Sequence, residues 1–462
     1  MAKLPLLSVS LNLLLLFHGC LARSSNFEQF QNECQINKLE SIEPVTRVKS
    51  EAGFTEWWNP NSQQLMCAAV AVLRETVEPQ GLVLPSFSNT NQLVHIIKGS
   101  GVLGMILPGC PATFQDSQHQ GRRQDQHQKI QRFREGDVIV LPAGVPHWFY
   151  NDANQPFVTV AFLHLGNSVN QLDRNPRKFH LAGNPEEEQK KLQRLQQQKQ
   201  GITESEQEEE EEKHKQCTNS LCFNPEYLAQ AFNVDEDVIR KIQEQGKSGT
   251  IIRVKNLQFI EPPRVQHEEG RRGSMGGDNG VYCAMKMKEN IAEPELADIF
   301  NPQAGRITTL NSFKLPLLSH LGMSAERGVL FNKGGLVPQW SDAHRIFYMV
   351  KGRARFQVVN QNGESVFDDY VEQGQLLTVP QNFAFMKRAG NEGAEWVSFY
   401  TNDNAKNTPM AGVGSYMQGV PEEVVAAAYQ ISREEAREVK FNNQNNFFFT
   451  SSSRPQPRAE EA

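Results

Sequence analysis

The chain has 462 residues, of which 39% are hydrophobic and 22% are charged, so it is long enough to bury two sizeable cores. Its 47 lysines and arginines against 53 aspartates and glutamates give a formal net charge of −6. A chain with this balance carries no large basic field, and we therefore expect no nucleic-acid partner.

The N-terminus has the pattern of a signal peptide. The apolar run at residues 4–17 is too short to span a bilayer comfortably, so we expect no membrane partner. Lys3 before the run and Ala22 after it predict a signal peptide over residues 1–22, cleaved between Ala22 and Arg23. The alternative is a buried N-terminal strand or helix. Secretion places the six cysteines after Cys20 in an oxidising compartment, where fifteen disulfide pairings are open to them.

The sequence pattern of the first half of the chain predicts a β-sheet fold. Short apolar runs broken by Gly, Pro and Asn predict strands at 93–97, 102–107, 138–141 and 157–163, as in an antiparallel sandwich or barrel. Two hydrophilic patches, 115–131 and 185–216, are predicted to be disordered surface loops. Residues 99–104 match the glycine spacing of a dinucleotide-binding loop, but a strand follows, so we predict a hairpin turn.

A helical unit at 225–243 follows, with Leu228, Phe232 and Val238 on its apolar face and Asp235 as an N-cap. After a glycine-rich break at 270–280, strands are predicted at 345–350, 355–359, 376–379 and 396–400. A second helical unit closes the chain.

The two halves resemble each other. Residues 136–142 match 374–380, Gly99 matches Gly352, and residues 231–236 match 428–433. Matches in the same order along the chain indicate a tandem duplication of one barrel with its helices.

One motif in the first half could carry chemistry. Gly136, Pro142, Gly144, His147 and Asn151 fit the second signature of the cupin barrel. A bound metal needs several N or O ligands from adjacent strands. Residues 81–92 contain no histidine and no acidic residue, and Gln92 stands where the first signature has Glu. We therefore predict that His147 is a structural remnant of a metal site.

The second half departs further from the cupin motif. Gln339 and Arg345 occupy its first signature, and Phe385 replaces the histidine of the second. We expect no catalytic residue, no metal and no cofactor in either barrel. Two alternatives are a metal-dependent cupin enzyme, which needs at least three ligands in one barrel, and a barrel that holds a small apolar or sugar ligand beside His147 and Trp148.

Two further features favour plain interpretations. Cys217 and Cys222 lie near His214, but the acidic flank and the oxidising route favour a local disulfide or loosely paired thiols over zinc. The five glutamates at 208–212 indicate a solvated loop rather than a weak calcium site.

Ordered segment matches then identify a family. They lie at residues 56–61, 279–280, 288–291, 304–311, 352–360, 378–383 and 431–436. On these segments the chain resembles the 11S seed storage globulins, or legumins, of the cupin superfamily over almost its full length. A vicilin-like storage globulin is the alternative, since it shares the double barrel but lacks the Asn-Gly cleavage position.

The resemblance implies a mainly β fold of two tandem cupin (jelly-roll-like) barrels, each followed by a small helical unit. It divides the chain into an N-terminal barrel at 23–250 with a disordered acidic loop near 185–216, a variable linker at 251–279, a C-terminal barrel at 280–445 and a flexible tail at 446–462.

The resemblance also implies a seed storage protein that reaches the protein storage vacuole by the secretory route. The precursor would assemble with itself as a trimer, and asparaginyl endopeptidase would cut it between Asn279 and Gly280. Disulfides would join Cys34 to Cys67 and Cys110 to Cys283, the second linking the two chains, and trimers would stack into a hexamer. The family contains many food allergens.

Overall fold

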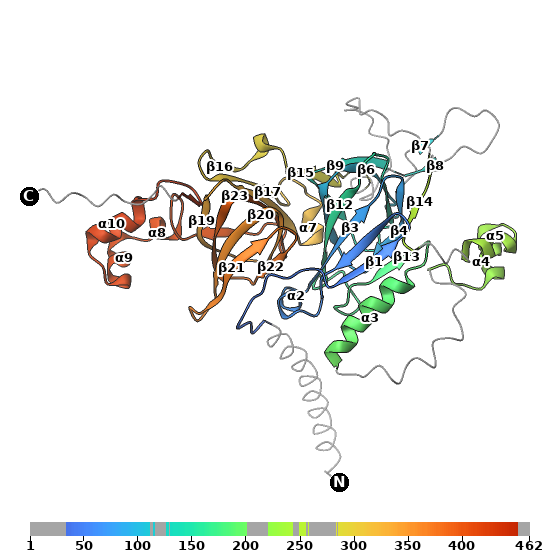
Figure 1. Ribbon diagram of the computed structural model, residues 1–462, viewed down its shortest axis with the longest axis horizontal. Helices are drawn as coiled ribbons and strands as arrows, with labels where there is room; N and C mark the ends of the chain where they lie inside the picture. Colours follow the sequence, from blue (N-terminus) through green and yellow to red (C-terminus); the bar gives the residue numbers. More distant parts are fainter. Residues whose placement is uncertain are drawn as a thin grey trace, which may run out of the picture.

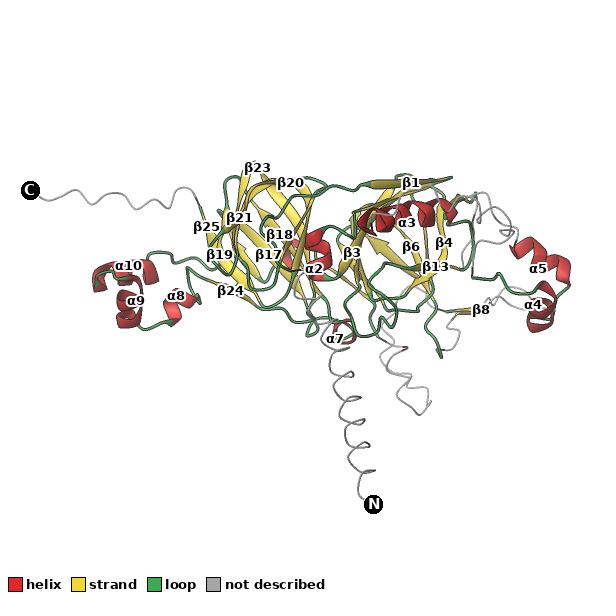
Figure 2. Cartoon of the chain, turned by 90° about the horizontal axis from the view of Figure 1, so that it is seen from below, coloured by secondary structure: helices red, strands yellow, loops and turns green. Residues whose placement is uncertain are grey.

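Two β-barrels lie side by side and make up most of the molecule (Figure 1). The computed structural model describes residues 34–110, 114–115, 126–128, 130–200, 220–243, 249–255, 257, 283 and 285–450. Small helical units lie at the two opposite ends of the pair, α4 and α5 beside one barrel and α8 to α10 beside the other (Figures 1 and 2). The mainly β architecture of two tandem barrels confirms the predicted fold class.

The N-terminal barrel is built from two antiparallel sheets. The first has the order β1-β2-β3-β12-β5-β10-β15, and the second has the order β13-β4-β11-β6-β9 with β14 also paired to β4. The elements are β1 (Thr46–Ser50), β2 (Gly53–Trp57), α2 (Gln63–Ala68), β3 (Val70–Val77), β4 (Gly81–Ser88), β5 (Gln92–Lys98), β6 (Ser100–Met105), β9 (Ile130–Arg134), β10 (Asp137–Leu141), β11 (His147–Tyr150), β12 (Phe157–His164), β13 (Lys178–His180), α3 (Glu186–Gln200), α4 (Pro225–Phe232), α5 (Glu236–Gln243), β14 (Ile251–Arg253) and β15 (Lys288–Asn290), with the short pair β7 (Phe114–Gln115) and β8 (Gln126–His127) beside them.

The C-terminal barrel repeats this design with longer strands. Its sheet runs β16-β17-β18-β23-β19-β24, and β20 pairs with β21, β22 and β23. The elements are η3 (Pro294–Leu296), β16 (Ile299–Asn301), β17 (Gly305–Leu310), α7 (Leu318–Leu321), β18 (Ser324–Leu330), β19 (Gly335–Ser341), β20 (Arg345–Val359), β21 (Ser365–Glu372), β22 (Leu376–Val379), β23 (Ala384–Tyr400), β24 (Asn407–Pro409), α8 (Tyr416–Gly419), α9 (Glu422–Tyr429), α10 (Arg433–Phe441) and β25 (Phe448–Phe449).

The turn expected at Gly99 is not a hairpin. Strand β5 belongs to the seven-stranded sheet, whereas β6 belongs to the six-stranded sheet, so the chain changes sheets at this glycine. Gly99 has φ +85°, and a Cβ there would lie 2.9 Å from the Cα of Phe157. A glycine is required because the backbone is left-handed and the neighbouring strand is close.

Part of each hydrophilic patch is ordered, contrary to the loop prediction. In the second patch residues 186–200 form α3, whose N-terminal turn carries the i, i+4 pairs Glu186–Lys190 and Glu187–Lys191. Glu, Gln, Lys and Leu are strong helix formers, so a sequence that is poor in aromatics still favours a helix here. In the first patch Gln128 donates from Nε2 to the carbonyls of Leu107 and Cys110.

Each half of the chain contributes a segment to the other barrel. Strand β15 pairs with β10 of the N-terminal barrel, although the sequence placed residues 280–445 in the C-terminal domain. Conversely, residues 36–42 lie on the C-terminal barrel, where Leu39 N donates to Val366 O at 2.8 Å and Ile42 pairs with Leu376. The domain boundary read from the sequence is therefore crossed in both directions.

The helical units are paired helices joined at a left-handed residue, Asn233 between α4 and α5 and Gln430 between α9 and α10. Ser432 forms a capping box with Glu435 at the start of α10, and Asn224 caps α4. Asp235 immediately precedes α5. The left-handed residues at matching positions agree with the duplication seen in the sequence. Among the described residues no helix has the length and apolar character needed to span a membrane.

Candidate functional site

The cupin motif of the N-terminal barrel lies on β10, β11 and the turns beside them. Gly136 and Gly144 have φ +85° and +73°, which fits glycine, and a Cβ at Gly136 would lie 2.1 Å from the Cβ of Ala292. Asn151 holds the next turn, because its Nδ2 donates to the carbonyls of Val77 and Gln155, both at 2.9 Å. These motif residues therefore shape the backbone of the barrel.

His147 is buried, and its Nδ1 lies 3.1 Å from the carbonyl oxygen of Val145. Burial lowers the pKa of His147 to about 4, so the ring is neutral at neutral pH. A neutral imidazole with its Nδ1–H bonded to a carbonyl has the tautomer that leaves Nε2 for a ligand. His147 thus has an unprotonated Nε2, as a metal-binding histidine requires.

The strand register brings a second histidine close to His147. Ser86 of β4 pairs with His147 on one side and with His180 of β13 on the other, so the three side chains lie in one row on one face of the sheet. Burial, followed by the charge of Lys178, lowers the pKa of His180 to about 3. No sequence pattern points to His180, because β13 is short and carries no motif.

A buried carboxylate from α3 completes this group. Glu188 is 3% exposed and accepts a 2.9 Å hydrogen bond from Trp57 Nε1, and its Oε2 lies 3.7 Å from His180 Nε2. Burial raises the pKa of Glu188. Beside it, Lys178 Nζ lies 3.0 Å from Glu75 Oε1. One carboxylate oxygen of Glu188 is held by Trp57 of the barrel, whereas Oε2 has no hydrogen-bond partner among the described residues, so the contact with Trp57 docks α3 on the barrel.

The C-terminal barrel places a different set of polar groups at the equivalent positions. Arg345 of β20 bonds Oε1 of Glu326 and donates from Nε to Ser398 Oγ at 3.1 Å. The other carboxylate oxygen of Glu326 accepts a 2.8 Å hydrogen bond from the Tyr400 hydroxyl. Both oxygens of Glu326 are thus engaged, and the arginine stands where a metal cupin would carry its glutamate.

Neither barrel brings together a metal-ligand set in the described parts of the chain. The one cluster of three potential ligand atoms found there consists of Cys34, Cys67 and His344, whose atoms lie within 4.8 Å of one another. Both sulfurs belong to the Cys34–Cys67 disulfide, and a disulfide offers no thiolate to a metal.

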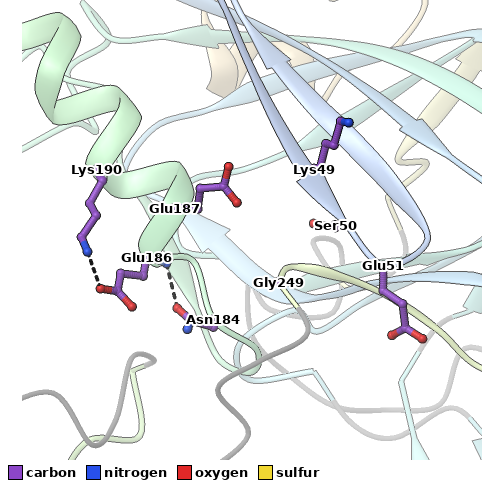
Figure 3. Close-up of a pocket in the computed structure, with 8 residues that line it drawn as sticks. All are labelled: Lys49, Ser50, Glu51, Asn184, Glu186, Glu187, Lys190 and Gly249. Carbon is purple, nitrogen blue, oxygen red and sulfur yellow. Dashed lines mark hydrogen bonds and ion pairs between the residues drawn. The ribbon is translucent and has the colours of Figure 1, made fainter.

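A surface hollow lies away from the motif. It measures about 740 Å³, is wide open to solvent, and lies between the start of α3 and the β1–β2 turn, with Lys49, Glu51, Glu187 and Gly249 among its lining residues (Figure 3). Lys190 is paired with Glu186 at 2.7 Å on its wall. His147 and Trp148 do not line it, and the Trp148 ring packs against Gly104. The hollow therefore gives no support to a ligand beside His147.

The cysteines are paired as the resemblance implies, Cys34 with Cys67 and Cys110 with Cys283. Cys222 is also disulfide-bonded, whereas Cys217 and His214 lie outside the described residues. The expected cleavage positions, Ala22 and Arg23 for the signal peptide and Asn279 and Gly280 for processing, also lie outside them, as does the glutamate run at 208–212.

Comparison with known proteins agrees with the double barrel. Two stretches of the chain, residues 38–187 and 289–437, match the cupin family. The fold and these matches define the class, a protein of two tandem cupin barrels.

The relatives narrow this class. Legumin A of Gossypium hirsutum is 58% identical, covering 96% of this chain and 97% of its own length. An 11S globulin seed storage protein of Anacardium occidentale is 46% identical, covering 94% of this chain and 96% of its own length. The crystal structure of the coconut allergen cocosin superposes with a TM-score of 0.78 at 42% identity, covering 90% of this chain and all of that one. The chain belongs to the 11S globulin, or legumin, family of seed storage proteins.

Two alternatives raised by the sequence are thereby decided. Vicilin from Capsicum annuum is only 16% identical, with a TM-score of 0.66, so it shares the fold alone. The relatives from Anacardium occidentale and Carya illinoinensis, 46% and 45% identical, are named as seed storage proteins and not for a reaction. The protein is a storage globulin and not an enzyme.

Proposed function

We propose that this storage globulin is made as one precursor chain, assembles as a trimer, and is cut between Asn279 and Gly280 by an asparaginyl endopeptidase. The resulting chains stay joined, and trimers then stack into a hexamer for deposition in the protein storage vacuole. The observation that carries this proposal is the exchange of segments between the two barrels. Because of this exchange, the two chains produced by a single cut would remain one folded molecule.

The segments on the two sides of the cut are held together in several ways. Strand β15 follows the cut and yet completes a sheet of the N-terminal barrel through its pairing with β10. Cys110 and Cys283 add a covalent link across the same position. Between the barrels, Phe162 stacks on Phe399 with ring centroids 3.7 Å apart. A cut in the linker therefore does not release either chain.

Exposed apolar side chains on the helical units support the trimer. On α4 and α5, Phe232 and Val238 are 56% and 41% exposed, and on α9 and α10 Tyr429 and Val439 are 49% and 46% exposed. The two units lie at opposite ends of the molecule (Figure 2). If the N-terminal helical unit of one copy packs on the C-terminal helical unit of the next copy, both apolar faces are covered. Such a head-to-tail contact can close into a ring.

The vacuolar destination rests on the relatives and on the oxidised cysteines. Relatives named as seed storage proteins match nearly the full chain. Two disulfides and the bonded Cys222 fit a secretory route, where such bonds persist.

Processing of the purified precursor in vitro tests this proposal. Treatment with asparaginyl endopeptidase should give one mass without reductant and two masses after reduction, with a new N-terminus at Gly280. Light scattering should show a trimer before the cut and a hexamer after it. The Asn279→Gln precursor is the matched control and should remain uncut and trimeric. A precursor that is monomeric, or that falls apart on cleavage without reductant, would contradict the proposal.

A further inference from the structure

At the positions where a metal-binding cupin has its ligands, the C-terminal barrel carries side chains poorly suited to binding a cation. In the N-terminal barrel Ser86 pairs with His147, and in the C-terminal barrel the corresponding pair is Gln339 and Phe385. Likewise Gln92 pairs with Leu141, and its counterpart Arg345 pairs with Val379. A cation site needs donors of electron pairs at these positions, whereas Arg345 can only donate hydrogen bonds.

A second cation lies in the same interior. Lys387 of β23 is 1% exposed, and its Nζ lies 3.2 Å from the centre of the Trp396 ring and 4.2 Å from that of Phe347. The guanidinium of Arg345, also 1% exposed, lies 4.3 Å from the Phe347 ring. One phenyl ring thus contacts both cations.

Lys387 is not required by the packing of the barrel. Its counterpart in the N-terminal barrel, two residues beyond the histidine position of the motif, is Phe149, a core side chain that is 4% exposed. A buried lysine costs free energy that a phenylalanine would not, because its charge is removed from water.

The polar groups in this interior are not all paired. Glu326 is the buried carboxylate there, and its two oxygens already bind Arg345 and the Tyr400 hydroxyl. No described residue accepts a hydrogen bond from Lys387 Nζ or from Arg345 Nη1. Two buried cations therefore share one carboxylate.

The other unmatched groups in these walls include two further donors. Gln339 Nε2 and Trp396 Nε1 are also buried, with no hydrogen-bond acceptor among the described residues. Buried donors without a partner are rare in folded proteins, since each loses its hydrogen bonds to water without replacing them. Together, four unmatched donors around a buried arginine and a buried lysine indicate a bound acceptor of hydrogen bonds, and an anion fits the arginine best.

We propose that the interior of the C-terminal barrel binds a small monovalent anion, a halide or a small carboxylate, between Arg345 and Lys387. Arg345 Nη1 and Lys387 Nζ donate to the anion, and Gln339, at a former first-signature position, is a further buried donor of the same barrel. The site goes beyond storage and does not depend on cleavage or on assembly.

The protonation of Lys387 should be coupled to the anion. Burial and the positive charge of Arg345 lower the pKa of Lys387 well below its ordinary value, while Glu326 acts in the opposite direction. An adjacent anion favours the charged amine, so proton binding and anion binding reinforce each other. Anion binding should therefore tighten as the pH falls.

Crystals of the full chain purified and grown in sodium bromide provide the direct test. The expected result is an anomalous difference peak within hydrogen-bond reach of Arg345 Nη1 and Lys387 Nζ. Water molecules alone on these donors, with no anomalous signal, would overturn the proposal for halides.

A solution measurement separates the site from general salt effects. At constant ionic strength, bromide or formate should raise the melting temperature of the full chain by about 2 °C or more. Lys387→Met should abolish this rise, and Lys351→Met, the same change at an exposed position of β20, should keep it. A response to formate without bromide would assign the site to carboxylates. If the melting temperatures of the natural chain and of both variants rise equally with each salt, the proposal is overturned. If Lys387→Met does not fold, a natural chain whose melting temperature responds to neither salt would overturn it.

Discussion

Asp137 of the N-terminal barrel accepts a 2.7 Å ionic hydrogen bond from Lys288, a residue on the far side of the expected cleavage position. Asp137 is 1% exposed, and its other oxygen accepts a 2.8 Å hydrogen bond from Asn290 Nδ2. A single buried carboxylate thus holds both ends of β15 on β10. The two chains of a cleaved molecule would share this contact.

Asp137→Asn should loosen β15. The substitution keeps the size of the side chain but removes the charge that Lys288 and Asn290 contact, so we expect a loss of about 1–3 kcal/mol in the free energy of unfolding. Denaturant unfolding of the precursor would measure it. As a control, Asp368→Asn breaks the solvent-exposed pair with Arg355 and should change stability little. Equal effects of the two substitutions would argue against a special role of the β15 contact.

The stacked rings of Phe162 and Phe399 should be the most costly to remove. Both side chains are at most 1% exposed, and truncation of a buried phenylalanine costs about 3–5 kcal/mol. Phe399→Ala should therefore lower the melting temperature strongly, as measured by scanning calorimetry. Phe313→Ala, at a 77% exposed position, should have almost no effect. A mild effect of Phe399→Ala would show that the barrels do not depend on their shared core.

Glu188 should fix α3 on the barrel. Glu188→Ala leaves the buried Trp57 Nε1 without its acceptor, so we expect faster amide hydrogen exchange across 186–200 and a loss of about 1–3 kcal/mol. Glu187→Ala removes only the exposed pair with Lys191 and serves as the matched control. If both variants exchange alike, docking of α3 does not depend on Glu188.

Acid should weaken the N-terminal barrel through His147. Its pKa is about 4 in the fold and about 6.5 in an unfolded chain, so the unfolded state binds the extra proton between these values. Its contribution to stability is therefore present above pH 6.5 and is lost as the pH falls toward 4. Between pH 6.5 and 4.5 the natural protein should lose about 2 kcal/mol more than His147→Gln. The exposed His320 offers a control, since His320→Gln should follow the natural protein.

Assembly should depend on the helical units. Phe232→Asp places a charge on the exposed apolar face of α4, and we expect the precursor to become monomeric in light scattering at unchanged secondary structure. Leu172→Asp changes a residue of similar exposure, 55%, outside the helices and should leave the trimer intact. A trimeric Phe232→Asp precursor would place the contact elsewhere.

The strands and caps were accessible from the sequence because they depend on local patterns. The run at 376–379 coincides with β22, and Asp235, predicted as an N-cap, directly precedes α5. Two predicted runs, 345–350 and 355–359, belong to one continuous strand, β20, because Gly352 bends it without ending it. Periodicity alone does not distinguish a bend from a break.

The buried polar groups were not accessible, because they depend on register and on long-range contacts. Glu188 lies in a Glu-rich stretch, and only its contact with Trp57, 131 residues away, separates it from its exposed neighbours. Lys387 was equally hidden, since no motif includes it. The sequence did reveal the loss of ligands at Arg345 and Phe385, but not that a second cation lies beside them.

Mass spectrometry of the protein isolated from the tissue that makes it, intact and then reduced, tests whether one cut leaves two linked chains. We expect one species with the mass of both chains that splits on reduction into an N-terminal chain beginning near Arg23 and a C-terminal chain beginning at Gly280. A single chain whose mass is unchanged by reduction would contradict this expectation.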